Sequence, residues 1–338
     1  MAKPKQQRID PKKVTAAANR PVPPTAKKKS GRPGGKPPSV PKPKKATLGD
    51  WISAARPLTL ALAIAPVALG TAAAYVLPHP DTGPGWHWVR AALCLAVAIG
   101  LQIGVNYAND YSDGIRGTDR QRVGPKRLVA SEAAKPRTVL IVALVFFALA
   151  AAAGSVIVVR TGIWWLFGVG AVCILAAYFY TGGKKPYGYY GLGELFVFVF
   201  FGIVATAGTQ FVLAGTVTIE GWLGGTIAGL FACAALMINN IRDRENDKLV
   251  GKRTLAVLLG DLLARIAYAV LMAAPFGILA FFVLFYENAY LVYFALLAAL
   301  PAVLIGITGQ GKDLVVALRL TLLTALAFGI GLGWAIAF

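Results

Sequence analysis

Nine long apolar stretches follow one another through most of this chain, and they constrain its fold more than any other feature. They run over about residues 58–76, 89–105, 139–159, 163–180, 195–213, 222–241, 266–285, 290–307 and 314–338. Each is close to the roughly 20 residues that an α-helix needs to cross a bilayer. Because 57% of the residues are hydrophobic and only 14% are charged, the sequence predicts an all-α integral membrane protein with nine transmembrane helices.

The connections between these stretches differ sharply in charge. If the N-terminus is cytoplasmic, the connections on that side hold seventeen Lys and Arg residues, whereas those on the other side hold only Arg90 and Arg160. Cytoplasmic loops of membrane proteins carry the excess of positive charge. The count supports nine crossings of a cell membrane, with a cytoplasmic N-terminus and the C-terminus on the opposite side.

Residues 1–50 have a different composition from the rest of the chain. They hold fourteen Lys and Arg residues against two acidic ones, with no aromatic residue. Such a segment buries too little apolar surface to offset the entropy of ordering, so we expect a disordered basic cytoplasmic tail followed by a membrane domain over residues 51–338. The tail suits anionic lipid headgroups, and without aromatic residues it predicts no specific nucleic-acid partner.

Six acidic residues form two clusters at the predicted cytoplasmic ends of the second and sixth stretches. They are Asp110, Asp113 and Asp119, and Asp243, Glu245 and Asp247. On a helix, Asn106, Asp110 and Asp113 share one face through their i, i+4 and i+7 spacing. The series Asn239, Asp243 and Asp247 repeats that pattern in steps of four, so the two clusters are expected to be two versions of one site.

Grouped carboxylates at a helix end repel one another unless a cation neutralises them. Neither cluster has a His or Cys residue nearby, and oxygen ligands favour Mg²⁺, which commonly joins protein carboxylates to substrate phosphates. Cationic side chains suited to diphosphate oxygens surround the clusters: Arg116, Arg122, Lys126, Arg127, Lys184, Lys185, Lys252 and Arg253. The sequence thus predicts a magnesium site for an apolar diphosphate.

These residues resemble the motifs of the UbiA superfamily of membrane prenyltransferases. The first motif of that superfamily runs Asn-Asp-x-x-Asp with a further Asp, and the second places two Asp residues four apart ahead of Gly-Lys-x-Thr. The matching residues are Asn109, Asp110, Asp113 and Asp119, and Asp243, Asp247 and Gly251 to Thr254. The third Asp usually stands four residues after the second, whereas Asp119 stands six after Asp113.

The resemblance covers about residues 51–338 and is most similar to the branch that prenylates 1,4-dihydroxy-2-naphthoate in menaquinone biosynthesis. The stretches that carry it are 105–119, 122–129, 180–194 and 239–243. It implies nine transmembrane helices around a central cavity, capped by cytoplasmic Asp-rich loops. It also implies Mg²⁺-dependent transfer of a polyprenyl group from polyprenyl diphosphate, with decarboxylation of the acceptor to give demethylmenaquinol.

The resemblance assigns roles to individual residues. Asp110, Asp113, Asp243 and Asp247, with Lys184, are the implied catalytic residues, and the same four aspartates with Asn106 and Asp119 are the implied metal site, with Asn239 also orienting its shell. The implied diphosphate-binding residues are Arg122, Lys126, Arg127, Arg242, Lys252 and Arg253. The implied acceptor-binding residues are Arg56, Tyr180, Lys185 and Asn239.

Two alternative functions stay open from the sequence. One is the same chemistry with another acceptor, such as 4-hydroxybenzoate, homogentisate or a porphyrin side chain. The other is a secondary transporter, which predicts ionisable residues near the middle of the membrane and broken helices there. The clustering of the carboxylates at one side of the predicted bundle favours the enzyme.

Overall fold

The computed structural model describes residues 45–77, 84–118 and 127–338, and over these ranges it contains helices and no β-strand. Residues 43–338 form one compact unit. The α-helices are α2 (Leu48–Ala55), α3 (Ala61–Tyr75), α4 (Pro84–Arg116), α5 (Pro136–Thr161), α6 (Leu166–Phe179), α7 (Gly193–Val197), α8 (Ala205–Ala214), α9 (Ile219–Leu249), α10 (Leu255–Phe285), α11 (Leu296–Thr308) and α12 (Asp313–Ala337). Three 3₁₀ segments, η1 (Pro57–Leu60), η2 (Tyr187–Tyr189) and η4 (Glu287–Ala295), and a π-helix, η3 (Phe198–Val204), join them.

The nine predicted stretches correspond to eight helical segments of membrane length and one shorter helix. The eight, which include segments continued through η1, η3 and η4, are 22 to 31 residues long, whereas α6 has 14 residues. The short helix begins after a hydrogen-bonded turn at Ile163–Trp165 and ends before the Thr181–Gly183 turn. The predicted all-helical membrane fold is confirmed within the described residues, and the count of nine full spans is approximate.

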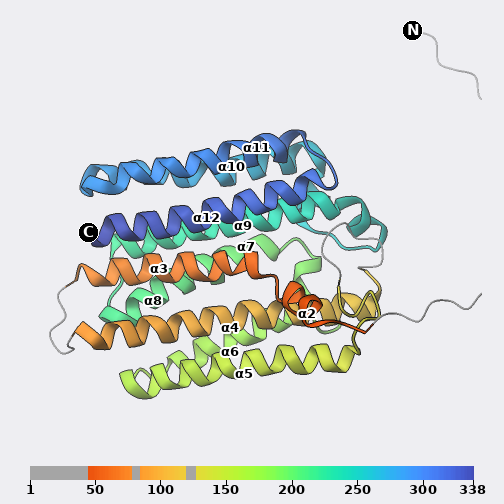
Figure 1. Ribbon diagram of the computed structural model, residues 1–338, viewed down its shortest axis with the longest axis horizontal. Helices are drawn as coiled ribbons and strands as arrows, with labels where there is room; N and C mark the ends of the chain where they lie inside the picture. Colours follow the sequence, from red (N-terminus) through yellow and green to blue (C-terminus); the bar gives the residue numbers. More distant parts are fainter. Residues whose placement is uncertain (1–44, 78–83, 119–126) are drawn as a thin grey trace, which may run out of the picture. The chain divides into compact units, whose positions relative to one another are not determined.

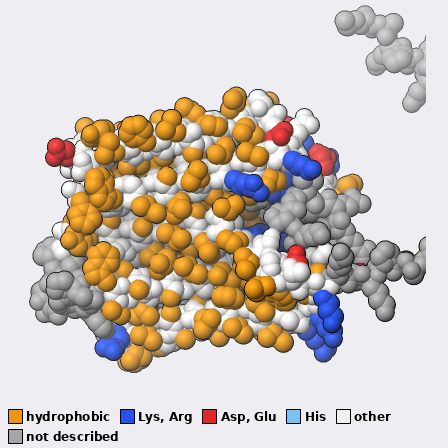
Figure 2. Space-filling model, in the orientation of Figure 1, with side chains coloured by type: hydrophobic (Ala, Val, Ile, Leu, Met, Phe, Trp, Pro, Cys, Tyr) orange, Lys and Arg blue, Asp and Glu red, His pale blue; other side chains and the backbone are white. Residues whose placement is uncertain are grey.

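The surface of the helix bundle is apolar, as expected for a protein embedded in a membrane. Figure 2 shows hydrophobic side chains along the length of the helices, with Lys, Arg, Asp and Glu side chains gathered toward the helix ends. In hydrocarbon every backbone polar group must be satisfied within the chain, which helices achieve. The basic tail predicted over residues 1–50 lies almost entirely outside the described residues.

The first membrane segment is interrupted at Arg56, and the interruption shapes the polar end of the bundle. Arg56 adopts a left-handed conformation (φ 53°, ψ 67°) between α2 and η1. The Asn106 side chain of α4 holds this break in place, since its Nδ2 donates to the Ala55 carbonyl (2.9 Å) and to Thr59 Oγ1 (3.1 Å). The start of the first span is therefore tied to the helix that carries the first Asp cluster.

The helices pack in two groups, with α3 against both (Figure 1). Helices α9, α10, α11 and α12 share the largest hydrophobic core with α3, whereas α4 packs mainly on α5. Aromatic side chains pack edge to face in that core, among them Phe231, Phe276 and Phe328. The second group has smaller cores, and it encloses one side of the cavity described below.

Close packing of η3 on α9 depends on glycine. A Cβ atom at Gly202 would lie 2.5 Å from both the Gly225 carbonyl oxygen and the Gly229 Cα. We expect Gly202→Ala to lower the free energy of unfolding by about 1–3 kcal/mol through overpacking. Thermal unfolding in detergent, followed by tryptophan fluorescence, measures this. Gly277→Ala on α10 is the matched control, because its Cβ would meet no atom within 4 Å, and a lowered midpoint for Gly277→Ala would contradict the argument.

Candidate functional site

A cavity of about 560 Å³ extends through the membrane domain and has one polar end. Its polar end is lined by residues from the cytoplasmic ends predicted for α4 and α9, together with Arg56, Tyr180 and Thr181. The rest of its wall is largely apolar and is built from α3, α4, α5, α6, η3, α8, α9 and α12. A cavity of this kind suits a ligand with a charged head and a long apolar tail.

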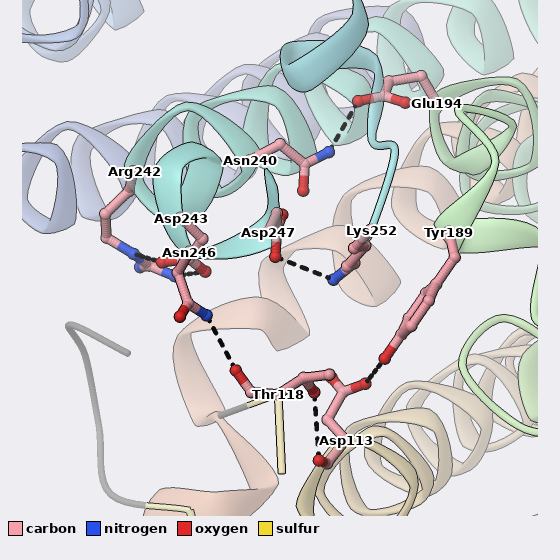
Figure 3. A network of polar contacts seen from close by, with 10 residues as sticks. All are labelled: Asp113, Thr118, Tyr189, Glu194, Asn240, Arg242, Asp243, Asn246, Asp247 and Lys252. Carbon is pink, nitrogen blue, oxygen red and sulfur yellow. Dashed lines mark hydrogen bonds and ion pairs between the residues drawn. The ribbon is translucent and has the colours of Figure 1, made fainter. Parts of the chain in front are cut away.

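On the α4 side, Asp113 is the carboxylate that lines the cavity. It is buried, and its Oδ1 accepts a hydrogen bond from the Tyr189 hydroxyl (2.8 Å) (Figure 3). Burial raises the pKa of Tyr189, and the nearby Asp113 carboxylate raises it further. The Tyr189 phenol therefore stays protonated at neutral pH and remains a donor to Asp113.

On the α9 side, two carboxylates one helical turn apart line the cavity, and each has a cationic neighbour. Arg242 pairs with Asp243 through two contacts of 2.7 Å, from Nε to Oδ1 and from Nη2 to Oδ2. Lys252 Nζ lies 3.7 Å from Asp247 Oδ1. Paired cations offset the repulsion between these carboxylates and the cost of burying them.

Contacts between the two motifs hold them across the cavity from each other. Asn246 Nδ2 on α9 donates to the Thr118 carbonyl (2.9 Å), just beyond the end of α4. Two cations lie over the Tyr189 ring, with Arg116 Cζ 5.5 Å and Lys252 Nζ 5.1 Å from its centroid. Tyr189 thus contacts a carboxylate from the first motif and a cation from the second.

The loop after α6 is fixed to the same end of the cavity. The Arg116 guanidinium donates to the carbonyls of Thr181 and Gly183, and the Thr181 hydroxyl donates to Asn109 Oδ1 (2.7 Å). The backbone of η2 is joined to the chain after α9, because the Arg253 amide donates to the Tyr189 carbonyl (3.0 Å). Three separate chain segments therefore build one polar site.

The structure brings most of the predicted site residues to this cavity. Those that line it are Arg56, Asn106, Asp113, Arg127, Tyr180, Asn239, Asp243, Asp247 and Lys252. Lys184, Lys185 and Arg253 are exposed and do not line it, and Arg242, which does not line it either, pairs with Asp243. Asp119, Arg122 and Lys126 lie outside the described residues.

Asp110 is placed differently from the other predicted metal ligands. It is fully buried, away from the cavity lining, and both of its carboxylate oxygens accept backbone hydrogen bonds. Oδ2 accepts from the Leu128 amide (2.8 Å) and Oδ1 from the Val129 amide (3.1 Å). Asp110 therefore holds the turn that follows Arg127 and, unlike Asp113, Asp243 and Asp247, does not line the cavity.

Sequence reasoning missed two parts of the site. The role of Tyr189 was one, since an aromatic residue in a Tyr-rich loop fits a membrane-interface belt or a substrate wall equally well. The other is the buried pair of Glu194 and Asn240, in which Asn240 Nδ2 donates to Glu194 Oε1 (2.9 Å). Tyr189 and Glu194 lie in the Tyr- and Gly-rich stretch 180–194, and Asn240 follows Asn239 at the end of the sixth apolar stretch. Polar residues at these places are the signal that marks them.

The donor set fits a magnesium ion that is completed by a phosphate ligand. Among the described residues, no group of three His, Cys, Asp or Glu side chains is arranged to hold a metal by itself. Magnesium usually takes only one or two protein carboxylates and completes its octahedron with water and substrate phosphates. Asp113, Asp243 and Asp247 all present carboxylate oxygens at one cavity end, so one or two of them at a time can meet that requirement.

Comparison with known sequences places these features in one family. The profile of the UbiA prenyltransferase family matches residues 63–314. A 1,4-dihydroxy-2-naphthoate octaprenyltransferase from Mycobacterium tuberculosis is 47% identical over 296 residues, which cover 87% of this chain and 98% of that protein. The Escherichia coli protein of the same name is 38% identical over 258 residues, which cover 74% of this chain and 81% of that protein.

Solved structures show the same fold at low identity. An apo UbiA homolog from Aeropyrum pernix K1 matches with a TM-score of 0.62 and 18% identity, covering 80% of this chain and 96% of that one. A UbiA homolog from Archaeoglobus fulgidus, bound to GPP and Mg²⁺, matches with a TM-score of 0.58 and 17% identity, covering 85% of this chain and 99% of that one.

Proposed function

Because this chain belongs to the UbiA prenyltransferase family, we propose that it transfers a polyprenyl group from polyprenyl diphosphate to 1,4-dihydroxy-2-naphthoate. The chain is a multi-pass membrane prenyltransferase, as its apolar stretches and Asp motifs predicted. The acceptor rests on the relatives from M. tuberculosis and E. coli, both named for that naphthoate. The product would be a demethylmenaquinol, a step of menaquinone biosynthesis in the cell membrane.

One observation carries this proposal: a single cavity joins a carboxylate-rich end to a long apolar wall. A diphosphate needs the first and a polyprenyl chain needs the second. The ionisable residues that line the cavity gather at one end of it, whereas a transporter would need them near the middle of the membrane. The excess of Lys and Arg in the loops at this end supports a cytoplasmic position for it.

Asp113, Asp243 and Asp247 are the residues we assign to Mg²⁺, with Asn106 and Asn239 beside them in the cavity wall. When bound, Mg²⁺ would supply positive charge to the leaving diphosphate. Asp110 is assigned to the backbone of residues 128–129 instead. Support for magnesium comes from the A. fulgidus homolog, whose structure contains GPP and Mg²⁺.

The cationic side chains at the polar end bind and orient the donor. Arg127 and Lys252 line the cavity near the carboxylates, where they can hold diphosphate oxygens as negative charge develops on them. As the allylic C–O bond breaks, the electron pair leaves with the diphosphate. The apolar wall, which includes Phe196, Phe200 and Phe201, keeps water from the resulting allylic cation.

The acceptor is held beside the donor and attacks through its electron-rich ring. The new C–C bond forms at the carbon that bears the carboxylate, and the bond to the carboxylate breaks with release of CO₂. The electron pair of that bond returns to the ring, so the charges balance. Arg56 and Tyr180 line the cavity and are the residues we assign to the acceptor carboxylate and a ring hydroxyl.

The test is transfer of a labelled polyprenyl group to 1,4-dihydroxy-2-naphthoate by detergent-solubilised protein, with magnesium and with EDTA. Magnesium-dependent formation of a lipid-soluble product is the expected result. If 4-hydroxybenzoate or homogentisate is prenylated and the naphthoate is not, the family holds and the acceptor assignment is wrong. Failure with every acceptor would contradict the proposed reaction.

Tyr189 is expected to contribute to activity without touching the reacting atoms. Tyr189→Phe removes the hydroxyl that donates to Asp113 (2.8 Å), and hydrogen bonds to charged groups are worth about 1.5–3 kcal/mol. We expect kcat/KM to fall about 10-fold in the polyprenyl-transfer assay. Tyr190→Phe is the matched control, because Tyr190 is 55% exposed. Equal kcat/KM values for the two variants would contradict this role.

A further inference from the structure

A stripe of polar side chains runs along the face of α4 that lines the cavity. Its members are spaced at i, i+4, i+7 and i+11, which places them on one side of the helix. Further along the same face, away from the Asp end, the lining side chains Ala98 and Cys94 are apolar. The polar members are Gln102, Asn106, Asn109 and Asp113.

Gln102 differs from the others in having no hydrogen-bond partner for a buried atom. Its side chain is 5% exposed, and among the described residues nothing hydrogen-bonds to its Oε1. By contrast, Asn106 donates to Ala55 and Thr59, and Asn109 accepts from Thr181. A buried carbonyl oxygen without a donor is costly, so its presence in a ligand cavity points to a ligand that supplies the donor.

The chemistry of the proposed substrates decides which of them supplies that donor. A polyprenyl chain has no hydrogen-bond donor, and an ionised diphosphate has only acceptors. The eleven residues from Gln102 to Asp113 span about 16 Å along the helix axis, so Gln102 also lies far from the diphosphate end. The hydroxyls of the aromatic acceptor are the donors that remain.

We infer that Gln102 is a specificity-determining residue for the acceptor, and that its Oε1 accepts a hydrogen bond from the 4-hydroxyl of 1,4-dihydroxy-2-naphthoate. This inference rests on the proposed function. The 1-hydroxyl lies beside the carboxylate and donates to it within the molecule, whereas the 4-hydroxyl is free. Accepting a hydrogen bond from the 4-hydroxyl fixes the orientation of the ring, so that the carbon bearing the carboxylate faces the allylic carbon.

The experiment compares two acceptors in wild-type protein and in Gln102→Leu. The acceptors are 1,4-dihydroxy-2-naphthoate and 1-hydroxy-2-naphthoate, which lacks the 4-hydroxyl. We expect Gln102→Leu to lower kcat/KM for the dihydroxy acceptor about 10- to 100-fold and to leave the KM for polyprenyl diphosphate unchanged. The ratio of kcat/KM for the dihydroxy acceptor to kcat/KM for the monohydroxy acceptor should fall by a similar factor. The two rings differ in reactivity, but that difference is the same in wild-type protein and in the variant, so it cancels when their ratios are compared.

Gln210→Leu is the matched control, since Gln210 is a buried glutamine whose hydrogen bonds are satisfied. Its Nε2 donates to the Ala73 carbonyl (3.0 Å) and to Thr218 Oγ1 (2.8 Å). We expect Gln210→Leu to lower the thermal midpoint and Gln102→Leu to keep or raise it. Gln102→Met provides a second unbranched replacement should the leucine variant fold poorly.

Three outcomes distinguish a failure of this inference from a failure of the proposed function. Reduced acceptor preference in the folded Gln102 variants supports it. An unchanged preference, with wild-type protein active on the dihydroxy acceptor, overturns the inference and leaves the proposed function intact. Wild-type protein that prenylates neither naphthoate overturns both.

Discussion

Asp247→Ala is expected to lower kcat/KM for polyprenyl transfer by about 10³-fold. Asp247 is buried at the polar end of the cavity and lies 3.7 Å from Lys252. Its removal takes away a carboxylate that we assign to Mg²⁺ and leaves Lys252 without this anionic neighbour. Electrostatic stabilisation of a developing charge in a site of this kind is typically worth 10²- to 10³-fold or more per group. Single-turnover transfer of a labelled polyprenyl group measures the loss.

Glu245→Ala is the matched control for Asp247→Ala. Glu245 lies two residues earlier on α9, but its side chain is 75% exposed and pairs with Arg244 at the surface. Exposed ion pairs contribute about 0–1 kcal/mol, so we expect activity within a factor of two of wild type. If the two variants lose activity equally, the loss reflects the net charge of α9 and the assignment of Asp247 is wrong.

Most of the fold follows from the apolar stretches, because a segment of about 20 apolar residues has few alternatives to a membrane helix. The sequence did not predict the break at Arg56, the π-helix η3 or the early start of α10. Sequence placed that helix from residue 266, whereas α10 begins at Leu255 and passes a kink at Gly260. The break at Arg56 depends on contacts with a distant part of the chain, because Asn106 hydrogen-bonds to Ala55 and Thr59 on its two sides.

The candidate site was predictable only in part, because a spacing pattern shows which residues share a helix face but not what packs against that face. The i, i+4 and i+7 pattern puts Asn106, Asp110 and Asp113 on one face, yet that face is wide enough to meet two different environments. Asp113 faces the cavity, whereas Asp110 faces the backbone of a turn eighteen residues later in the chain. No helical periodicity specifies which loop returns to pack against a helix.

Asp110→Asn is expected to destabilise the protein by about 1–3 kcal/mol. Asp110 is 0% exposed, and its two oxygens accept from the amides of Leu128 and Val129 at 2.8 and 3.1 Å. Asparagine has one acceptor oxygen, so one of these buried amides loses its partner and faces an NH₂ group, at a cost of about 1–3 kcal/mol. Thermal unfolding in detergent, with tryptophan fluorescence as the readout, measures the shift.

Asp113→Asn makes the same chemical change three residues later, and the two variants should differ in what they lose. Asparagine at 113 keeps an acceptor oxygen for the Tyr189 hydroxyl, so the thermal midpoint should stay near that of wild type. Activity should fall instead, because a carboxylate assigned to Mg²⁺ is gone while the amide binds metal weakly. Activity measured per folded molecule should therefore fall further for Asp113→Asn than for Asp110→Asn. The reverse order would contradict the assignment of Mg²⁺ to Asp113 and of the turn at residues 128–129 to Asp110.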